Sequence, residues 1–192
     1  MIQDIKKILY HESTILRRLD ELASEITEDY RGRDITVIAV LNGSLVFMAD
    51  LLRRIPLHLQ LDCLSVSSYH GTRSAGGVKF HKGQFRDVRH RHVLILDDIL
   101  DTGATLKAIR EHIAAKSDVL SIKICVLLRK KLDIPKVADA DYVGFEIPNE
   151  FVVGYGLDYN QRYRNLPFIG VLTDEAIRRH DRGRERAITS VE

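Results

Sequence analysis

The sequence predicts an α/β fold with a mostly parallel central sheet flanked by helices. Short, nearly continuous apolar runs rich in β-branched residues are typical of strands that are buried on both faces, as in a parallel sheet. These runs alternate with segments in which apolar residues recur every three or four positions, as they do along one face of a helix. Strands and helices that alternate in this way imply right-handed crossovers between parallel strands.

The first half of the chain contains two expected helices and two expected strands. Ser13 can cap a first helix, on which apolar residues recur at helical spacing: Ile15, Leu19, Leu22 and Ile26. Residues 35–41, ITVIAVL, form a β-branched run that predicts a buried strand. Asn-Gly-Ser at 42–44 interrupts this run, and a second helix pattern begins at Leu45. Residues 59–66 can form the next strand.

The second half repeats the alternation. The apolar run at residues 93–96 predicts a strand, and a helix pattern follows from Ala104 to Ile113. Three further strands are expected at residues 122–128, 142–147 and 151–154. Residues 70–91 are polar, rich in glycine and basic side chains, and long for a connection, which is typical of functional or mobile loops. The charged tail after Arg178 is expected to fray.

Composition limits the possible classes of protein. The 192 residues fit one domain with a small additional hood, and 45% of them are apolar. A formal net charge of +2 does not indicate a nucleic-acid or membrane partner. Cys63 and Cys125 lie far apart in apolar runs, so we expect buried thiols without a disulfide or metal. The sequence contains neither a signal peptide nor a membrane span, so we expect a cytoplasmic protein.

The segment 93–106, VLILDDILDTGATL, carries unusual chemistry. In open parallel sheets, ligands bind beyond the carboxyl ends of the strands. Here three aspartates and two threonines surround Gly103 where a strand gives way to a helix. The free N–H groups and dipole of a helix start favour a phosphate, and hydroxyl groups add donors. The neighbouring carboxylates suit the vicinal hydroxyls of a sugar or a Mg²⁺ ion.

Simpler interpretations of this segment exist. Asp, Thr and Gly before a helix also form an ordinary turn and N-cap. Two adjacent acids at the end of a hydrophobic strand are nevertheless costly unless they are used. The segment has no Gly-Lys-Ser/Thr of a P-loop and only one glycine, so neither a P-loop nor a dinucleotide fingerprint is present.

VLILDDILDTGATL closely resembles the phosphoribosyl-pyrophosphate-binding motif of the type I phosphoribosyltransferases. Residues 41–44, LNGS, are similar to the pyrophosphate loop of that family, and Ser68 and Tyr69 lie where its mobile active-site loop begins. Residues 142–164, YVGFEIPNEFVVGYGLDYNQRYR, resemble the purine-binding hood of the hypoxanthine-guanine phosphoribosyltransferases. The resemblance covers roughly residues 5–175.

The resemblance implies roles for the residues of the first motif. Asp97 and Asp98 would hold the ribose hydroxyls, directly or through Mg²⁺. Asp101 would act as the general base that takes the proton from purine N7, although an acid at a helix start can also serve only the helix dipole. The 5′-phosphate would be bound by four consecutive residues: Thr102, Gly103, Ala104 and Thr105.

The resemblance also implies roles in the hood. Lys130 would reach purine O6, although its run of three cations is also typical of a solvated strand end. Phe151 would stack on the base and Val152 would offer its carbonyl group, whereas an aromatic residue opening FVVG is otherwise more often core. Asp158, which could also be a simple turn aspartate, matches a purine-site carboxylate associated with a second Mg²⁺. Arg164 would contact pyrophosphate through its planar guanidinium group.

The pyrophosphate loop of the family would comprise Leu41, Asn42 and Gly43. Many relatives have a basic residue where Asn42 stands. Because main-chain N–H groups do most of the binding in such a loop, we expect function to be retained while pyrophosphate affinity can differ. The family also has a non-proline cis peptide bond here, which would fall at Leu41–Asn42.

The activity that the resemblance implies is displacement of pyrophosphate from ribose C1 by a purine ring nitrogen. The substrates would be phosphoribosyl pyrophosphate with hypoxanthine or guanine, and Mg²⁺ would be the cofactor. Residues 68–91 would close as a lid that excludes water. The N-terminal segment and about residues 130–175 would form the hood of a single domain. Relatives are commonly homodimers or homotetramers.

Two other functions are compatible with parts of the pattern. A xanthine- or uracil-preferring transferase could share the fold, although the hood segment argues against uracil. A nucleotide-sensing regulator that binds RNA or DNA could retain the motif. The net charge of +2 gives no support to RNA binding, and the first core strand begins too early for a preceding winged helix. An electrophoretic shift with total RNA distinguishes the regulator from the enzyme.

Overall fold

The computed structural model divides the chain into two compact units. The larger unit is Leu16–Asn149, and the smaller unit combines Met1–Ile15 with Glu150–Glu192. The structure describes residues 1–68, 78–81, 87–116, 118–133 and 137–189.

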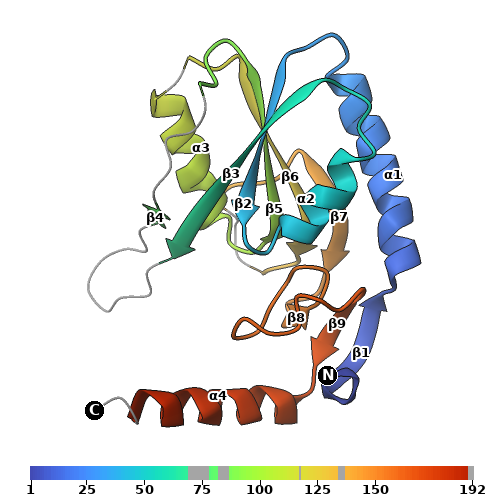
Figure 1. The fold of residues 1–192 in the computed structure, drawn as a ribbon, viewed down its shortest axis with the longest axis vertical. Coiled ribbons are helices and arrows are strands. Elements are labelled where there is room, and N and C mark those ends of the chain that lie inside the picture. Colours follow the sequence, from blue (N-terminus) through green and yellow to red (C-terminus); the bar gives the residue numbers. More distant parts are fainter. Residues whose placement is uncertain (69–77, 82–86, 117, 134–136, 190–192) are drawn as a thin grey trace. The chain divides into compact units, whose positions relative to one another are not determined.

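A six-stranded sheet forms the centre of the larger unit (Figure 1). Its strand order is β4-β3-β2-β5-β6-β7. The strands are β2 (Ile35–Leu41), β3 (Leu59–Ser68), β4 (Val78–His81), β5 (His92–Leu100), β6 (Ser121–Lys130) and β7 (Tyr142–Ile147). All neighbouring pairs are parallel except β3 and β4, which are antiparallel. The predicted α/β class with a mostly parallel sheet is therefore confirmed.

Helices cover both faces of this sheet, with α3 (Ala104–Lys116) on one side and α1 (Glu12–Asp29) and α2 (Leu45–Leu52) on the other (Figure 1). The first six residues of β2 are all buried, because a strand covered on both faces has no solvent side. The half-buried Arg18 guanidinium of α1 donates to the backbone oxygens of Val143 and Gly144 at 3.0 Å each.

The connections in this sheet determine where a ligand can bind. From β2 the chain runs outward to β3 on one side, and after the β4 hairpin it returns to β5 on the other side of β2. This reversal makes the carboxyl ends of β2 and β5 a topological switch point, where the two following turns diverge and leave a crevice. Residues 42–44 follow β2 and residues 101–103 follow β5, so both predicted phosphate turns lie at this point.

The smaller unit contains a three-stranded antiparallel sheet of order β1-β9-β8. Its elements are the 3₁₀ helix η1 (Ile2–Asp4), β1 (Ile5–Tyr10), β8 (Val152–Val153), β9 (Ile169–Leu172) and α4 (Asp174–Thr189). A separate apolar core joins the sheet to α4 and contains Val153, Tyr163, Leu166, Leu172 and Ala176. The smaller unit thus has its own hydrophobic stabilisation.

Several predicted boundaries were wrong. The first helix begins at Glu12, and the carbonyl oxygen of His11 accepts from the N–H of Ile15 at 3.1 Å, so Ser13 lies inside the helix and is not its cap. Strand β5 continues through Asp97 and Asp98 to Leu100, because neighbouring β6 extends the ladder beyond the apolar run, whereas the pairing with β2 ends at Leu96. The charged tail is helical to Thr189, since α4 packs on the core of the smaller unit.

Two further expectations also needed correction. The long polar connection contains strand β4, which was not predicted, and residues 69–77 and 82–86 of that connection lie outside the described part. Cys125 is buried as expected, but Cys63 is exposed. Residues 61, 63 and 65 of β3 alternate as exposed positions, so this strand has an uncovered face. Among the described residues, no helix is long and apolar enough to span a membrane.

Candidate active site

The turn between β5 and α3 forms a small cradle. Gly103 has a positive φ of 85°, and a Cβ atom there would lie 2.7 Å from the backbone oxygen of Ala138. Only glycine therefore fits this position without displacement of the backbone. The Val137 N–H donates to the Thr102 carbonyl oxygen at 3.0 Å and holds the turn from outside. A cavity of about 90 Å³ is lined by residues 97 and 99–106.

This cradle has the donors that an anion requires. Helix α3 begins at Ala104, so the N–H groups of its first turn have no helical acceptor. The positive end of the helix dipole favours an anion at the same place. Thr102 is exposed and Thr105 is partly exposed, and both residues line the cavity. The geometry therefore suits a phosphate group.

Two adjacent carboxylates precede the cradle. Asp97 is only 8% exposed, and its Oδ1 accepts the N–H of Asp98 at 3.0 Å. Burial, and then the neighbouring Asp98 charge, raise the pKa of Asp97 well above its usual range. The folded protein therefore disfavours a negative charge on Asp97, and a bound cation or hydroxyl donor would relieve this cost.

The turn after β2 lies directly against the second of these carboxylates. A Cβ atom at Gly43 would fall 1.7 Å from Oδ2 of Asp98, so the backbone of this turn approaches the carboxylate more closely than any other residue type permits. The peptide bond Leu41–Asn42 is cis, as the resemblance implied. Ser44 is buried, and its hydroxyl donates to the Val40 carbonyl oxygen at 2.5 Å.

The carboxyl ends of β5 and β6 bring a carboxylate and an amine together. Leu100 is level with Arg129 in the sheet, which places the following residues, Asp101 and Lys130, side by side. Their charged groups form an ion pair with an N–O distance of 3.2 Å. The Lys130 side chain is 13% exposed and that of Asp101 is 51% exposed, so the amine is largely covered while the carboxylate faces solvent.

The cations beside Lys130 have other partners. Arg129 forms ion pairs with Asp139 and Glu146, and Lys131 lies 3.2 Å from the carboxylate of Glu146. These pairs lie along the exposed sides of β6 and β7. Lys130 is thus the member of the three-cation run that meets the turn after β5.

The smaller unit carries the predicted base-stacking residues. Phe151 is 48% exposed, and its ring meets that of Tyr159 edge to face with the centroids 5.0 Å apart. Val152 is buried in β8 and pairs with Val171 of β9. An exposed aromatic face held by a second ring is available for stacking on a planar ligand.

A tight turn at residues 158–164 joins Asp158 and Arg164. Their side chains form an ion pair at 2.7 Å, and the Asp158 carboxylate also accepts the N–H of Gln161 at 2.7 Å. The Arg164 guanidinium donates to the Gly156 carbonyl oxygen at 2.7 Å. Asp158 is therefore a turn aspartate, which was one of the two interpretations of the sequence, and it is also the ion-pair partner of Arg164.

Comparison with known proteins identifies the family. Residues 6–160 match the phosphoribosyl transferase domain. The chain belongs to the phosphoribosyltransferase family. It is 44% identical over 173 residues to the hypoxanthine-guanine phosphoribosyltransferase of Streptococcus pneumoniae, which covers 90% of this chain and 96% of that protein.

Solved structures agree with this assignment. The crystal structure of a hypoxanthine phosphoribosyltransferase from Staphylococcus aureus superimposes with a TM-score of 0.86 at 45% identity, over 91% of this chain and 95% of that chain. A Trypanosoma cruzi hypoxanthine phosphoribosyl transferase, studied for the role of its C-terminal region in oligomeric state and enzymatic activity, gives 0.85 at 34% identity over 93% and 97%. The family resemblance of the sequence is confirmed.

In this phosphoribosyltransferase, the predicted site residues fall in two groups. The larger unit brings together the turns after β2 and β5 with Lys130, and the smaller unit brings together Phe151, Asp158 and Arg164 in the part that follows β7. Ser68 is the last residue of β3, and Tyr69 lies outside the described residues. No group of three or more potential metal-ligating side chains is found in the described parts of the chain.

The sequence interpretation missed how some of these residues are connected. The contact of Gly43 with Asp98 and the pairing of Asp101 with Lys130 both join segments that are distant in sequence. The available signal was that each residue lies at or just beyond the carboxyl end of a strand in one parallel sheet, because the carboxyl ends of such strands share an edge.

Proposed function

We propose that this phosphoribosyltransferase acts in purine salvage. It transfers the 5-phosphoribosyl group from phosphoribosyl pyrophosphate to hypoxanthine and guanine, with IMP or GMP and pyrophosphate as products. The relatives that cover nine-tenths of the chain are named hypoxanthine-guanine phosphoribosyltransferases, which supports this substrate class.

The ion pair between Asp101 and Lys130 is the observation that carries the proposal. A 6-oxopurine needs a donor at O6 and an acceptor for the proton on N7, and these two atoms lie on the same edge of the purine. A lysine and a carboxylate 3.2 Å apart offer that complementary pair. Asp101 takes the N7 proton as the ring nitrogen attacks ribose C1, and its charge stabilises the cationic character that develops on the sugar.

The cradle and the paired carboxylates position the sugar. The N–H groups and hydroxyls of residues 102–105 hold the 5′-phosphate, and Asp97 with Asp98 holds the ribose hydroxyls. The Gly43 backbone, which lies against Asp98, lets the turn of Leu41 and Asn42 present main-chain N–H groups to pyrophosphate. Fixing both ends of the substrate sets the geometry for attack at C1.

Mg²⁺ fits this arrangement. Carboxylate oxygens are its preferred protein ligands, and the adjacent carboxylates of Asp97 and Asp98 lie at the end of the sheet where the sugar would bind. Asp97 and Asp98 would hold one ion through the ribose, and Asp158 would hold a second. When bound with the substrate, the metal neutralises charge on the pyrophosphate leaving group.

The remaining residues complete the site. Phe151 stacks on the purine, the Val152 carbonyl group contacts its edge, and Arg164 binds pyrophosphate. The chain acts as one domain whose hood comprises the N-terminal segment and about residues 130–175. We place the enzyme in the cytoplasm as a homodimer or homotetramer. The Trypanosoma cruzi relative, whose C-terminal region was studied for its role in the oligomeric state, supports an oligomer.

One assay tests the proposed function. The purified chain is mixed with phosphoribosyl pyrophosphate, Mg²⁺ and single free bases: hypoxanthine, guanine, xanthine, adenine and uracil. Nucleotide formation is followed by chromatography and pyrophosphate release by a coupled assay. We expect turnover with hypoxanthine and guanine that stops in excess chelator. Turnover with uracil alone, or none with any base, would refute the proposal.

A further inference from the structure

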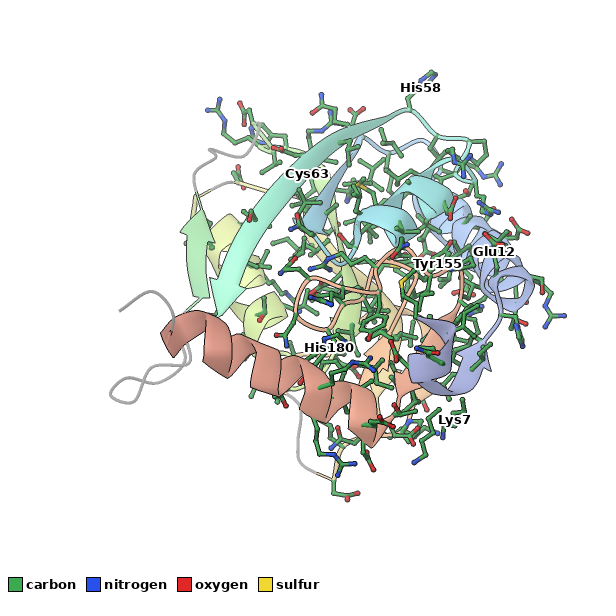
Figure 2. The ribbon with its side chains drawn as sticks, turned by 60° about the horizontal axis from the view of Figure 1, so that its bottom comes forward. Lys7, Glu12, His58, Cys63, Tyr155 and His180 are labelled. Atoms are coloured by element: carbon green, nitrogen blue, oxygen red, sulfur yellow. The ribbon has the colours of Figure 1, made fainter. Side chains whose placement is uncertain are left out.

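Four polar residues of the smaller unit form a connected network that has no part in the proposed chemistry. Asp4 ends η1, Tyr163 belongs to the 158–164 turn, and Arg179 and His180 lie on α4. We call these four residues the Asp4 network. They join three segments that are far apart in the sequence, and Figure 2 shows His180 on the side of α4 that faces the turn.

The buried carboxylate of Asp4 is the centre of this network. Asp4 is only 7% exposed, and Arg179 donates to its Oδ1 at 2.7 Å while the Tyr163 hydroxyl donates to its Oδ2 at 3.0 Å. The hydrogen bond from Arg179 lowers the pKa of Asp4, against the opposing effect of burial. The carboxylate is therefore charged, and both of its oxygens have donors.

The number of protons available fixes which group donates in each hydrogen bond of the network. The Tyr163 oxygen also lies 2.6 Å from Nε2 of His180. A hydroxyl carries one proton, and a charged carboxylate can only accept, so Tyr163 donates to Asp4 and His180 donates its Nε2–H to Tyr163. Burial, and then the nearby charges of Arg162 and Arg179, lower the pKa of His180. The neutral tautomer with the proton on Nε2 satisfies every one of these contacts.

Tyr163 is directly followed by Arg164, whose guanidinium lies 2.7 Å from the Asp158 carboxylate. The backbone between Asp158 and Arg164 is unusual, because three non-glycine residues have positive φ: Asn160 at 50°, Gln161 at 62° and Tyr163 at 72°. Such conformations persist where the surroundings over-determine them, and they are frequent where a ligand is held.

Tyr163 anchors this turn in the apolar core, but the other side of the turn borders open space. A cavity of about 530 Å³ lies beside it, lined by the Asp4 network, Met1 and residues 161–162 and 164–165. On that side the turn has space to move, and the hydrogen bonds of Tyr163 cross it to α4 and η1. Helix α4 is fixed separately through Ala176 in the apolar core. The position of the turn therefore depends on the polar network more than the position of α4 does.

We propose that the Asp4 network consists of positioning residues for pyrophosphate binding. Asp4, Tyr163, Arg179 and His180 hold the 158–164 turn so that Asp158 and Arg164 present their charged groups to the pyrophosphate end of the substrate. This inference rests on the proposed function of Asp158 and Arg164. By this inference α4, a helix outside the family motifs, affects substrate affinity through the position of the 158–164 turn.

The test removes a single oxygen atom. Tyr163→Phe keeps the ring in the apolar core and deletes the hydroxyl that joins Asp4 to His180. The matched control is Asp181→Asn, which changes the exposed acceptor of the Tyr159 hydroxyl on the same helix, one residue beyond His180. For each variant we would measure kcat, the KM of each substrate, the melting temperature and the oligomeric mass.

We expect Tyr163→Phe to raise the KM for phosphoribosyl pyrophosphate about tenfold, the effect of losing one hydrogen bond to a charged group. The KM for hypoxanthine should rise less than the KM for phosphoribosyl pyrophosphate, because Arg164 does not contact the base in our proposal and Phe151 and Lys130 lie outside the turn. Asp181→Asn should match the unmodified enzyme. A lower melting temperature with both KM values unchanged, or an equal rise in both, would refute a role specific to pyrophosphate.

A second pair of variants keeps the inference testable if Tyr163→Phe does not fold. His180→Gln retains an N–H donor near the position of Nε2, whereas His180→Leu has none, so Gln should restore the affinity that Leu loses. If the unmodified chain forms no nucleotide, the proposed function fails independently. Calorimetric titration with magnesium pyrophosphate then decides the inference, since equal affinity of His180→Gln and His180→Leu would refute it.

Discussion

The two regions that we assign to phosphate groups are built differently. In the larger unit, the turns after β2 and β5 are held by close backbone contacts of Gly43 and Gly103 at a switch point of the sheet. In the smaller unit, the 158–164 turn has positive φ at three non-glycine residues and is held by side-chain hydrogen bonds beside a cavity. The first design depends on the absence of side chains, and the second depends on their presence.

This difference indicates what each region tolerates. A side chain added at Gly43 or Gly103 meets a carboxylate or the backbone, so substitutions of these two glycines should act through crowding. The smaller unit has space, so substitutions there should act through lost hydrogen bonds. The following predictions begin with the charged groups that we propose for proton transfer and base recognition, and then test this contrast.

Asp101→Asn should produce the largest loss. Asparagine keeps the size of the side chain but cannot take the N7 proton, so kcat should fall by about 10²–10⁴ while the melting temperature changes little. Steady-state kinetics and thermal unfolding measure the two quantities. The control is Asp139→Asn, which changes an exposed partner of Arg129 and should leave kcat unchanged. Near-normal turnover by a folded Asp101→Asn variant would remove Asp101 from the mechanism.

Lys130→Ala should relax the choice of base. A charged lysine offers donors only, so the amino group at position 6 of adenine leaves it unpaired, and we expect adenine to be disfavoured by on the order of 10²–10⁴ in kcat/KM. The variant should reduce this ratio to about 10, whereas Lys131→Ala, which alters the pair with Glu146, should preserve it. An unchanged ratio in Lys130→Ala would assign recognition to another group.

Gly43→Ala should damage both stability and binding. The added methyl group would collide with the Asp98 carboxylate, so we expect a cost of about 1–3 kcal/mol and a higher KM for phosphoribosyl pyrophosphate. Gly144→Ala is a matched crowding control, because its Cβ would lie 2.4 Å from the Leu127 carbonyl oxygen in β6. Both variants should melt earlier. If KM rises equally in both, the effect belongs to the sheet and not to the pyrophosphate loop.

Asp4→Asn should destabilise the protein in a pH-dependent way. Because the pKa of Asp4 is lowered in the folded state, its charge stabilises the fold above the unfolded pKa of about 4, and this contribution is lost as the pH falls. We expect a loss of about 1–3 kcal/mol near neutral pH that shrinks on acidification, measured by denaturant unfolding at several pH values. A loss independent of pH would contradict a charged Asp4.

Asp97→Asn should have the smallest effect on stability and the opposite sign. The raised pKa of Asp97 means that the folded state retains a proton that the unfolded chain releases above about pH 4, so the unmodified protein loses stability as the pH rises. Asparagine removes this loss and can still accept the Asp98 N–H. We expect a gain of about 1 kcal/mol near neutral pH, with lower activity. Reduced stability at neutral pH would show that the carboxylate is needed for the fold.

Much of the fold could be predicted from local patterns. β2 matched its predicted range, and α3 began where its pattern began. A fully buried strand gives a continuous apolar run, and an amphipathic helix gives apolar residues at helical spacing, so both can be recognised from local sequence. The short strands β1 and β9 and the helix α4 lacked such patterns. They form because residues distant in sequence pair or pack with them, as Ala176 does in the core of the smaller unit.

The sequence by itself determined the sheet class, the family and the identity of the acids, cations and glycines that could serve a phosphoribosyl transfer. These follow from local composition and from motifs whose residues lie close together along the chain. Only the tertiary structure decided that Gly43 lies against Asp98, that Asp101 pairs with Lys130 and that Asp4 meets Tyr163. Such contacts depend on strand order and on chain crossings over long sequence separations, and no spacing within a segment encodes them.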